Sequence, residues 1–123
     1  MRRRRCGPGC FFLPAMEHFR DLASEPAADI YRTRVGWLVK IDLPGVRPED
    51  IEVRVRSRRL TVQGVRRDWL LEEGCHYYSL EISYSPFERH LEFPESLDEA
   101  NIQTEYRAGM LLVRILTEGR GHE

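Results

Sequence analysis

The 123-residue sequence has no long hydrophobic run, because its longest uninterrupted apolar stretch is Met110 to Val113. A membrane helix needs about 20 apolar residues, so the sequence predicts no transmembrane span. An export signal is also poorly supported. The apolar patch from Phe11 to Ala15, behind four arginines, is short for a signal peptide and contains Pro14. We therefore expect a soluble, cytoplasmic protein with no membrane partner.

An excess of charge of one sign is also missing, since 19 basic residues face 20 acidic ones and the formal net charge is −1. A nucleic-acid binder should show a basic field on its folded part. One basic cluster deserves this hypothesis, and it consists of Arg54, Arg56, Arg58, Arg59, Arg66 and Arg67. Acidic residues lie in the same region, and no aromatic residues are interleaved there to stack on bases. The pattern favours a solvated strand face and no nucleic-acid partner.

Cysteine is scarce, with Cys6, Cys10 and Cys75 as the three examples. Cys6 and Cys10 flank a Gly-Pro-Gly turn, so they could form a redox pair or half of a metal site, with His18 as a third candidate ligand. No second ligand pair follows, whereas a zinc site normally has four ligands. We therefore expect reduced thiols and neither a metal nor another cofactor, and the response of this pair to oxidants stays open.

Signatures of catalysis are absent as well. The sequence contains no Gly-x-Ser-x-Gly, no His-Glu-x-x-His, and neither of the glycine-rich phosphate-binding patterns. Cys75 and His76 are adjacent, so on a strand their side chains would point to opposite faces. Glu72 and Glu73 fit a solvated loop. The sequence therefore predicts no catalytic residue and no enzyme.

Three regions follow from the change of pattern near Pro26: an N-terminal arm over residues 1–28, a single domain over 29–116 and a short tail over 117–123. The length suits one core, and 41% hydrophobic residues can supply it. Apolar residues of the arm recur at intervals of three and four, which predicts a short helix beginning near Pro14.

Strand-like alternation replaces the helical spacing after Pro26. Three segments interrupt this alternation. They are a long loop from Gly64 to Gly74, a single helical turn over Ser96–Glu99 and a hairpin turn at Ala108-Gly109. The expected strands cover residues 30–34, 37–43, 51–56, 60–65, 77–83, 86–93, 102–107 and 110–116. Seven or eight short strands at this spacing predict an all-β, immunoglobulin-like β-sandwich.

With the strands laid out, the sequence resembles the small heat-shock proteins of the bacterial type, whose shared unit is the α-crystallin domain. The most specific match is the run Asp-Leu-Pro-Gly-Val-x-Pro-Glu-Asp-Ile over residues 42–51. Leu60–Gly64, Phe87-x-Arg89 and Phe93-Pro94-Glu95 continue it. The resemblance covers about residues 26–116.

The resemblance implies an ATP-independent holdase that binds partly unfolded proteins and prevents their aggregation under stress. It also implies a homodimer in which the strand Tyr77–Ser83, carried on the long loop from Arg66, pairs with the strand Ile30–Arg34 of the partner. Such an exchange would explain why the loop keeps apolar residues. The expected interface residues are Ile30, Tyr31, Trp69, Tyr77, Tyr78, Leu80 and Ile82.

The apolar residues of the arm are the expected client contacts, because exposed apolar clusters usually mark a binding surface. The alternative is that the arm packs on its own sandwich. The expected contacts are Phe11, Phe12, Leu13, Met16, Phe19 and Leu22.

Departures from the family limit the assembly. Relatives carry an Ile-x-Ile tail motif that docks in a neighbour's groove, and nothing after Leu116 has that form. The groove positions in this chain are Ile51, Val53, Val55, Ile102 and Thr104. The arm is also short, so we expect a dimer or a small, loose assembly. Two alternatives stay open: an adaptor or co-chaperone-like module with one defined partner, and a subunit that acts by co-assembly with another small heat-shock protein.

Overall fold

Seven strands form the part of the chain that the computed structural model describes, residues 23–117. A turn of 3-10 helix over Pro48–Asp50 precedes the third strand. The strands are β1 (Ala28–Thr33), β2 (Gly36–Asp42), β3 (Ile51–Arg56), β4 (Arg59–Val65), β5 (Pro86–Glu92), β6 (Asn101–Arg107) and β7 (Met110–Leu116).

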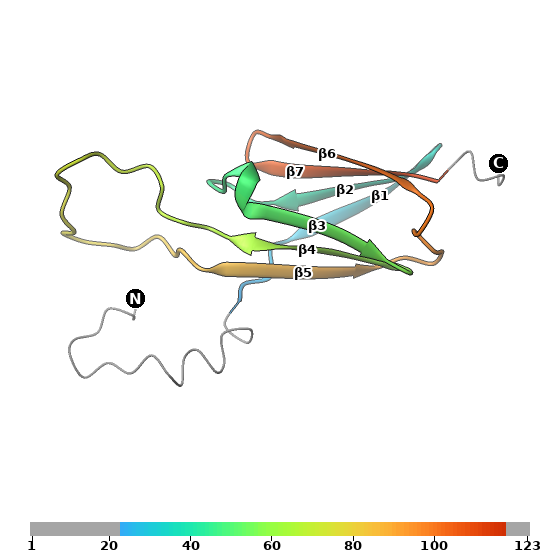
Figure 1. The fold of residues 1–123 in the computed structure, drawn as a ribbon, viewed down its shortest axis with the longest axis horizontal. Helices are drawn as coiled ribbons and strands as arrows, with labels where there is room; N and C mark the ends of the chain where they lie inside the picture. Colours follow the sequence, from blue (N-terminus) through green and yellow to red (C-terminus); the bar gives the residue numbers. More distant parts are fainter. Residues whose placement is uncertain (1–22, 118–123) are drawn as a thin grey trace.

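The strands form two antiparallel sheets that pack face to face, as Figure 1 shows. One sheet has the order β1-β2-β7-β6 and the other has the order β3-β4-β5. The expected all-β sandwich is therefore confirmed. Its outer strands are β1 and β6 in the larger sheet and β3 and β5 in the smaller one. Among the described residues, Ser24 bonds to the outer edge of β5, whereas no strand pairs with the outer edges of β1, β3 and β6.

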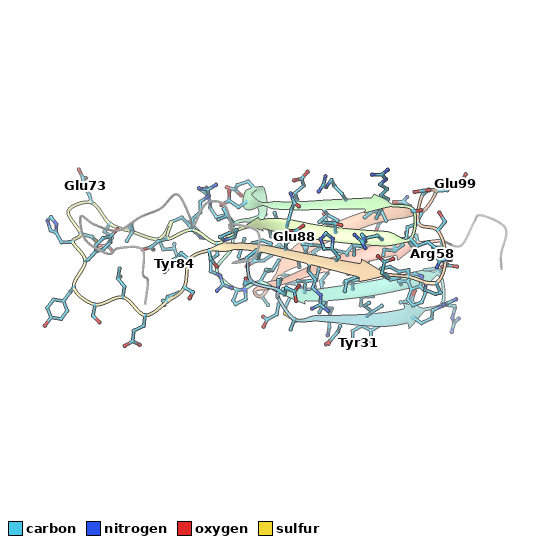
Figure 2. The ribbon with its side chains drawn as sticks, turned by 90° about the horizontal axis from the view of Figure 1, so that it is seen from below. Tyr31, Arg58, Glu73, Tyr84, Glu88 and Glu99 are labelled. Atoms are coloured by element: carbon cyan, nitrogen blue, oxygen red, sulfur yellow. The ribbon has the colours of Figure 1, made fainter. Side chains whose placement is uncertain are left out.

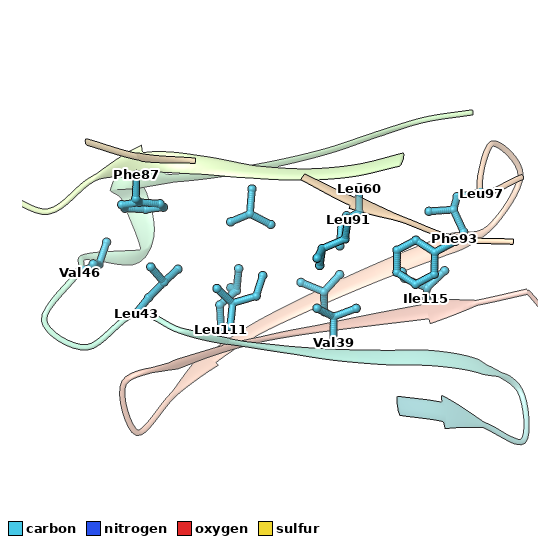
Figure 3. Close-up of a cluster of buried hydrophobic side chains, with 13 residues drawn as sticks. Val39, Leu43, Val46, Leu60, Phe87, Leu91, Phe93, Leu97, Leu111 and Ile115 are labelled. Carbon is cyan, nitrogen blue, oxygen red and sulfur yellow. The ribbon is translucent and has the colours of Figure 1, made fainter. Parts of the chain in front are cut away.

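The core lies between the sheets because apolar side chains alternate along each strand (Figure 3). Val39, Ile41 and Leu43 point inward from and just beyond β2, as their spacing predicted, and all three are buried. Phe87, Leu91 and Phe93 are buried from the opposite sheet. These two sets meet and exclude water from the centre of the sandwich.

The hairpin between β6 and β7 turns at Ala108-Gly109, as predicted. Both turn residues have positive φ, 55° at Ala108 and 76° at Gly109, which is the pattern of a type I′ turn. The Tyr106 hydroxyl donates to the carbonyl oxygen of Leu43 over 2.6 Å and ties this hairpin to the end of β2.

Replacing Ala108 by Gly is expected to stabilise the domain by about 0.5–1 kcal/mol. The left-handed backbone conformation is sterically unfavourable for a residue with a Cβ atom and is not for glycine. Urea unfolding followed by circular dichroism measures the change. The same substitution at Ala28, in β1, should destabilise the domain, since glycine loses more entropy in a strand. A loss of stability in Ala108→Gly would contradict the turn geometry.

Two sequence predictions are wrong in the described chain. Residues 77–83 form no strand, because no strand edge of the described residues lies beside them to supply backbone partners. Ser96–Glu99 does not form the predicted turn of helix. The Ser96 hydroxyl accepts from the Asp98 N–H over 3.2 Å, and the Leu97 N–H donates to the distant Ser57 carbonyl oxygen over 2.7 Å. In addition, β1 begins at Ala28 and ends at Thr33, slightly before the predicted range.

The expected arm helix near Pro14 lies outside the described residues. The described chain begins beside the smaller sheet, where Ser24 forms a parallel bridge with Phe87 of β5. The Ser24 N–H donates to the Pro86 carbonyl oxygen over 3.0 Å, and the Ser24 carbonyl oxygen accepts from the Glu88 N–H over 2.9 Å. The chain then crosses to β1 in the other sheet, so the described residues start close to the point where β5 begins.

Candidate functional site

The longest connection in the described chain is the loop between β4 and β5, residues 66–85. It projects beyond one end of the sandwich, with Tyr84 near its base and Glu73 toward its far end (Figures 1 and 2). Its exposed large apolar residues are Trp69, Leu70, Leu71, Tyr77, Tyr78, Leu80 and Ile82. Monomeric soluble proteins seldom expose so many apolar side chains together, so the loop is a candidate binding surface.

The second part of this surface is the outer edge of β1. Ile30 and Tyr31 are 40% and 43% exposed, and the Lys40 ammonium lies 5.0 Å from the centre of the Tyr31 ring. An edge strand presents a row of unpaired N–H and C=O groups that can pair with another strand. Figure 2 shows Tyr31 on this edge and Glu73 at the far end of the loop. The predicted interface residues therefore occupy two separate places on one chain.

The start of the loop is held against its own domain. The Trp69 indole N–H donates to the carbonyl oxygen of Gly45 over 3.0 Å. Arg67 Nε lies 3.4 Å from Asp50 Oδ1, and the Arg66 N–H donates to the Ser85 carbonyl over 3.0 Å. Sequence reasoning missed these contacts, although the presence of a tryptophan in a polar loop was a signal that part of the loop is packed.

The predicted groove residues lie on the outer strands β3 and β6. Ile51, Val53 and Val55 are half-buried and alternate with exposed charged residues, as predicted. Ile102 is half-buried against the same core, whereas Thr104 is exposed. Both strands lie on the same side of the sandwich in Figure 1. Four of the five predicted groove residues therefore lie at the margin of the core, three on β3 and one on β6. Thr104 does not.

Several arginines of the basic cluster are paired with acidic or amide side chains. Arg59 forms an ion pair with Glu92 on the neighbouring strand. Arg54 lies 3.8 Å from Glu52 and donates to the Gln63 amide oxygen over 3.3 Å. This arrangement agrees with a solvated, charge-paired sheet face.

Residues 23–117 contain no group of three or more His, Cys, Asp or Glu side chains placed to hold a metal ion. Cys75 is an exposed free thiol in the loop. Within the same residues, no helix is long and apolar enough to cross a membrane. Cys6, Cys10 and the six expected client contacts of the arm lie outside the described part of the chain.

Comparison with known proteins gives the family. The model of the Hsp20/alpha crystallin family matches residues 29–122. Spore protein SP21 of Stigmatella aurantiaca is 33% identical over 90 residues, which cover 73% of this chain and 53% of that protein. The chain spans between about half and two thirds of the length of three curated relatives that it matches.

Solved structures agree with this assignment. HspA from Xanthomonas axonopodis is 29% identical with a TM-score of 0.59, over 76% of this chain and 93% of that one. Heat shock protein 16.0 from Schizosaccharomyces pombe is 25% identical with a TM-score of 0.63, over 80% of this chain and 92% of that one. The chain belongs to the Hsp20/alpha crystallin family, the small heat-shock proteins.

Proposed function

We propose that the protein is an ATP-independent chaperone that binds partly unfolded proteins and keeps them from aggregating. Membership of the small heat-shock proteins is the observation that carries this proposal. Apolar contact is non-directional, so one apolar surface can bind many unrelated clients. The apolar residues of the arm supply this surface, and binding through them requires no nucleotide and no catalytic group.

The working unit in this proposal is a homodimer formed by strand exchange. Residues 77–83 of one chain add to the free edge of β1 of the other, where they acquire the backbone partners that they lack within their own chain. By the period of two, Tyr78, Leu80 and Ile82 share one side of the added strand. The exposed apolar residues of the loop and of β1 support this pairing.

The edge formed by β3 and β6 provides a second contact in this proposal. Its half-buried Ile51, Val53, Val55 and Ile102 would receive apolar side chains of an extended segment, from a client or from another small heat-shock protein. Two strand edges on the same side of the sandwich support such a site, because an extended peptide can pair with an open edge while its alternate side chains enter between the sheets.

A client aggregation assay without ATP tests the function. A heat-sensitive client is warmed with the purified protein while turbidity is recorded, and multi-angle light scattering gives the mass of the protein in the same preparation. We expect suppression near one chain per client chain from a dimer or small assembly. A folded dimer that suppresses nothing would reject the holdase and favour the adaptor or co-assembly alternatives, and a folded monomer would favour the adaptor.

A further inference from the structure

The loop between β4 and β5 begins at an anchor made by one hydrogen bond and one ion pair. The hydrogen bond joins the Trp69 indole N–H to the Gly45 carbonyl, 3.0 Å apart. Gly45 has a φ of 75° in the turn that follows β2, a conformation that directs the backbone sharply and suits glycine. The Arg47 guanidinium lies 5.8 Å from the centre of the Trp69 ring and adds a cation–π contact.

The ion pair joins the loop to the 3-10 turn before β3. Asp50 Oδ1 lies 3.4 Å from Arg67 Nε, and its other oxygen lies 3.1 Å from Arg47 Nε. The Asp50 side chain is only 10% exposed, so water screens this carboxylate less than an exposed one. The hydrogen bond from Arg47 Nε fixes the orientation of this carboxylate, so Arg67 meets a better-placed and better-shielded partner than it would in an isolated surface pair.

Both contacts use the same connection, residues 43–50 between β2 and β3, and both involve the first four residues of the loop. The loop as a whole projects from the end of the sandwich (Figure 1). A loop of 20 residues fixed only at its ends would sample many directions. Holding its start limits those directions and lowers the entropy that is lost when residues 77–83 pair with another chain.

We infer that Trp69 and Arg67 are positioning residues for strand exchange: they hold the loop on the connection between β2 and β3, so that Tyr77–Ser83 is presented to the partner's β1. This inference rests on the dimer proposed above. It gives Trp69 a different role from the sequence prediction, which placed it among the residues that contact the partner. Its indole N–H is already bonded within its own chain.

The variant Trp69→Phe tests the role because it keeps an aromatic ring and removes the N–H donor. One hydrogen bond corresponds to roughly a three- to tenfold change in an equilibrium constant. The bond forms within each chain, so its loss acts by lowering the fraction of free chains whose loop is anchored. Two chains must both be anchored to pair, so the dimer dissociation constant should rise, by up to about ten- to a hundredfold. Dilution followed by sedimentation measures it. Trypsin cleavage after Arg66 and Arg67 should also accelerate about three- to tenfold, since cleavage there requires the anchor to open.

Trp37→Phe is the matched control. It also removes an indole N–H bond, in this case from Trp37 to a Glu95 carboxylate oxygen 3.0 Å away. Trp37 contacts Phe93, which lies at the end of the core opposite Val46 (Figure 3). This variant should lower the unfolding midpoint without changing the dissociation constant or the cleavage rate. Arg67→Gln should weaken the dimer in the same direction as Trp69→Phe.

Two failures are distinguishable. If the parent dimer forms and Trp69→Phe leaves both the dissociation constant and cleavage unchanged, or tightens the dimer, the anchor has no positioning role and the proposed function stands. If the parent chain is a monomer at every concentration, the exchange dimer is rejected. The positioning role of Trp69 and Arg67 is then rejected with it. Faster cleavage of Trp69→Phe in that monomer would show only that the contact holds the loop.

Discussion

Replacing Phe12, Met16 and Phe19 together by Ser is expected to remove most of the suppression of client aggregation while the sandwich stays folded. On the helix that their spacing of four and three predicts, the three residues would share one face, and burial of each large apolar side chain against a client would contribute about 1.5–3 kcal/mol. Turbidity of a heat-sensitive client, recorded at several chaperone-to-client ratios, measures the loss.

The matched control replaces Glu17, Arg20 and Asp21 by Ser, which makes three substitutions in the same arm and leaves its apolar face intact. This variant should protect the client as well as the parent protein. Circular dichroism and urea unfolding of both variants establish that the domain is unchanged. Undiminished suppression by the apolar triple variant would show that clients bind elsewhere, and the exposed residues of the loop would be examined next.

Replacing Leu80 and Ile82 together by Asp is expected to convert the dimer into a folded monomer. Both side chains are exposed within the chain, so the substitutions remove nothing from the core. In the proposed exchanged strand they would face the partner, and each substitution would remove about 1.5–3 kcal/mol of burial. The symmetric dimer loses this in both copies, so its dissociation constant should rise by at least about four orders of magnitude.

Ser79→Asp with Ser83→Asp is the control, because these residues alternate with Leu80 and Ile82 and face the other side of the strand. This variant adds the same charge and should remain largely dimeric. Multi-angle light scattering gives the mass of each variant, and urea unfolding gives its stability. A dimer that persists in Leu80→Asp with Ile82→Asp would place the interface outside this strand.

Most of the fold was predictable because the signal is local. Val39, Ile41 and Leu43 recur with the period of a strand, and the structure buries all three. Ala108 and Gly109 form the predicted two-residue hairpin between β6 and β7. Each of these predictions depends on residues close together in the sequence, so they hold without knowledge of which strands pair.

The candidate site was predictable only in part. Apolar residues in a polar loop marked Trp69, Leu70 and Leu71 as unusual, and the structure exposes all three. The alternation of Tyr77–Ser83 predicts a strand, yet the described chain forms none there. Alternation indicates which side chains could share a face, whereas a strand also needs backbone partners, and residues 23–117 of a single chain supply none to this segment.

The sequence by itself determined the family motif over residues 42–51, the β-sandwich and the faces of its strands, because composition and period act over short distances. Only the tertiary structure decided that Trp69 meets Gly45, 24 residues earlier, and that Arg67 meets the shielded carboxylate of Asp50. The physical reason is that a hydrogen bond and an ion pair depend on direction and distance. The path of the whole chain through two sheets sets both, and no local pattern encodes that path.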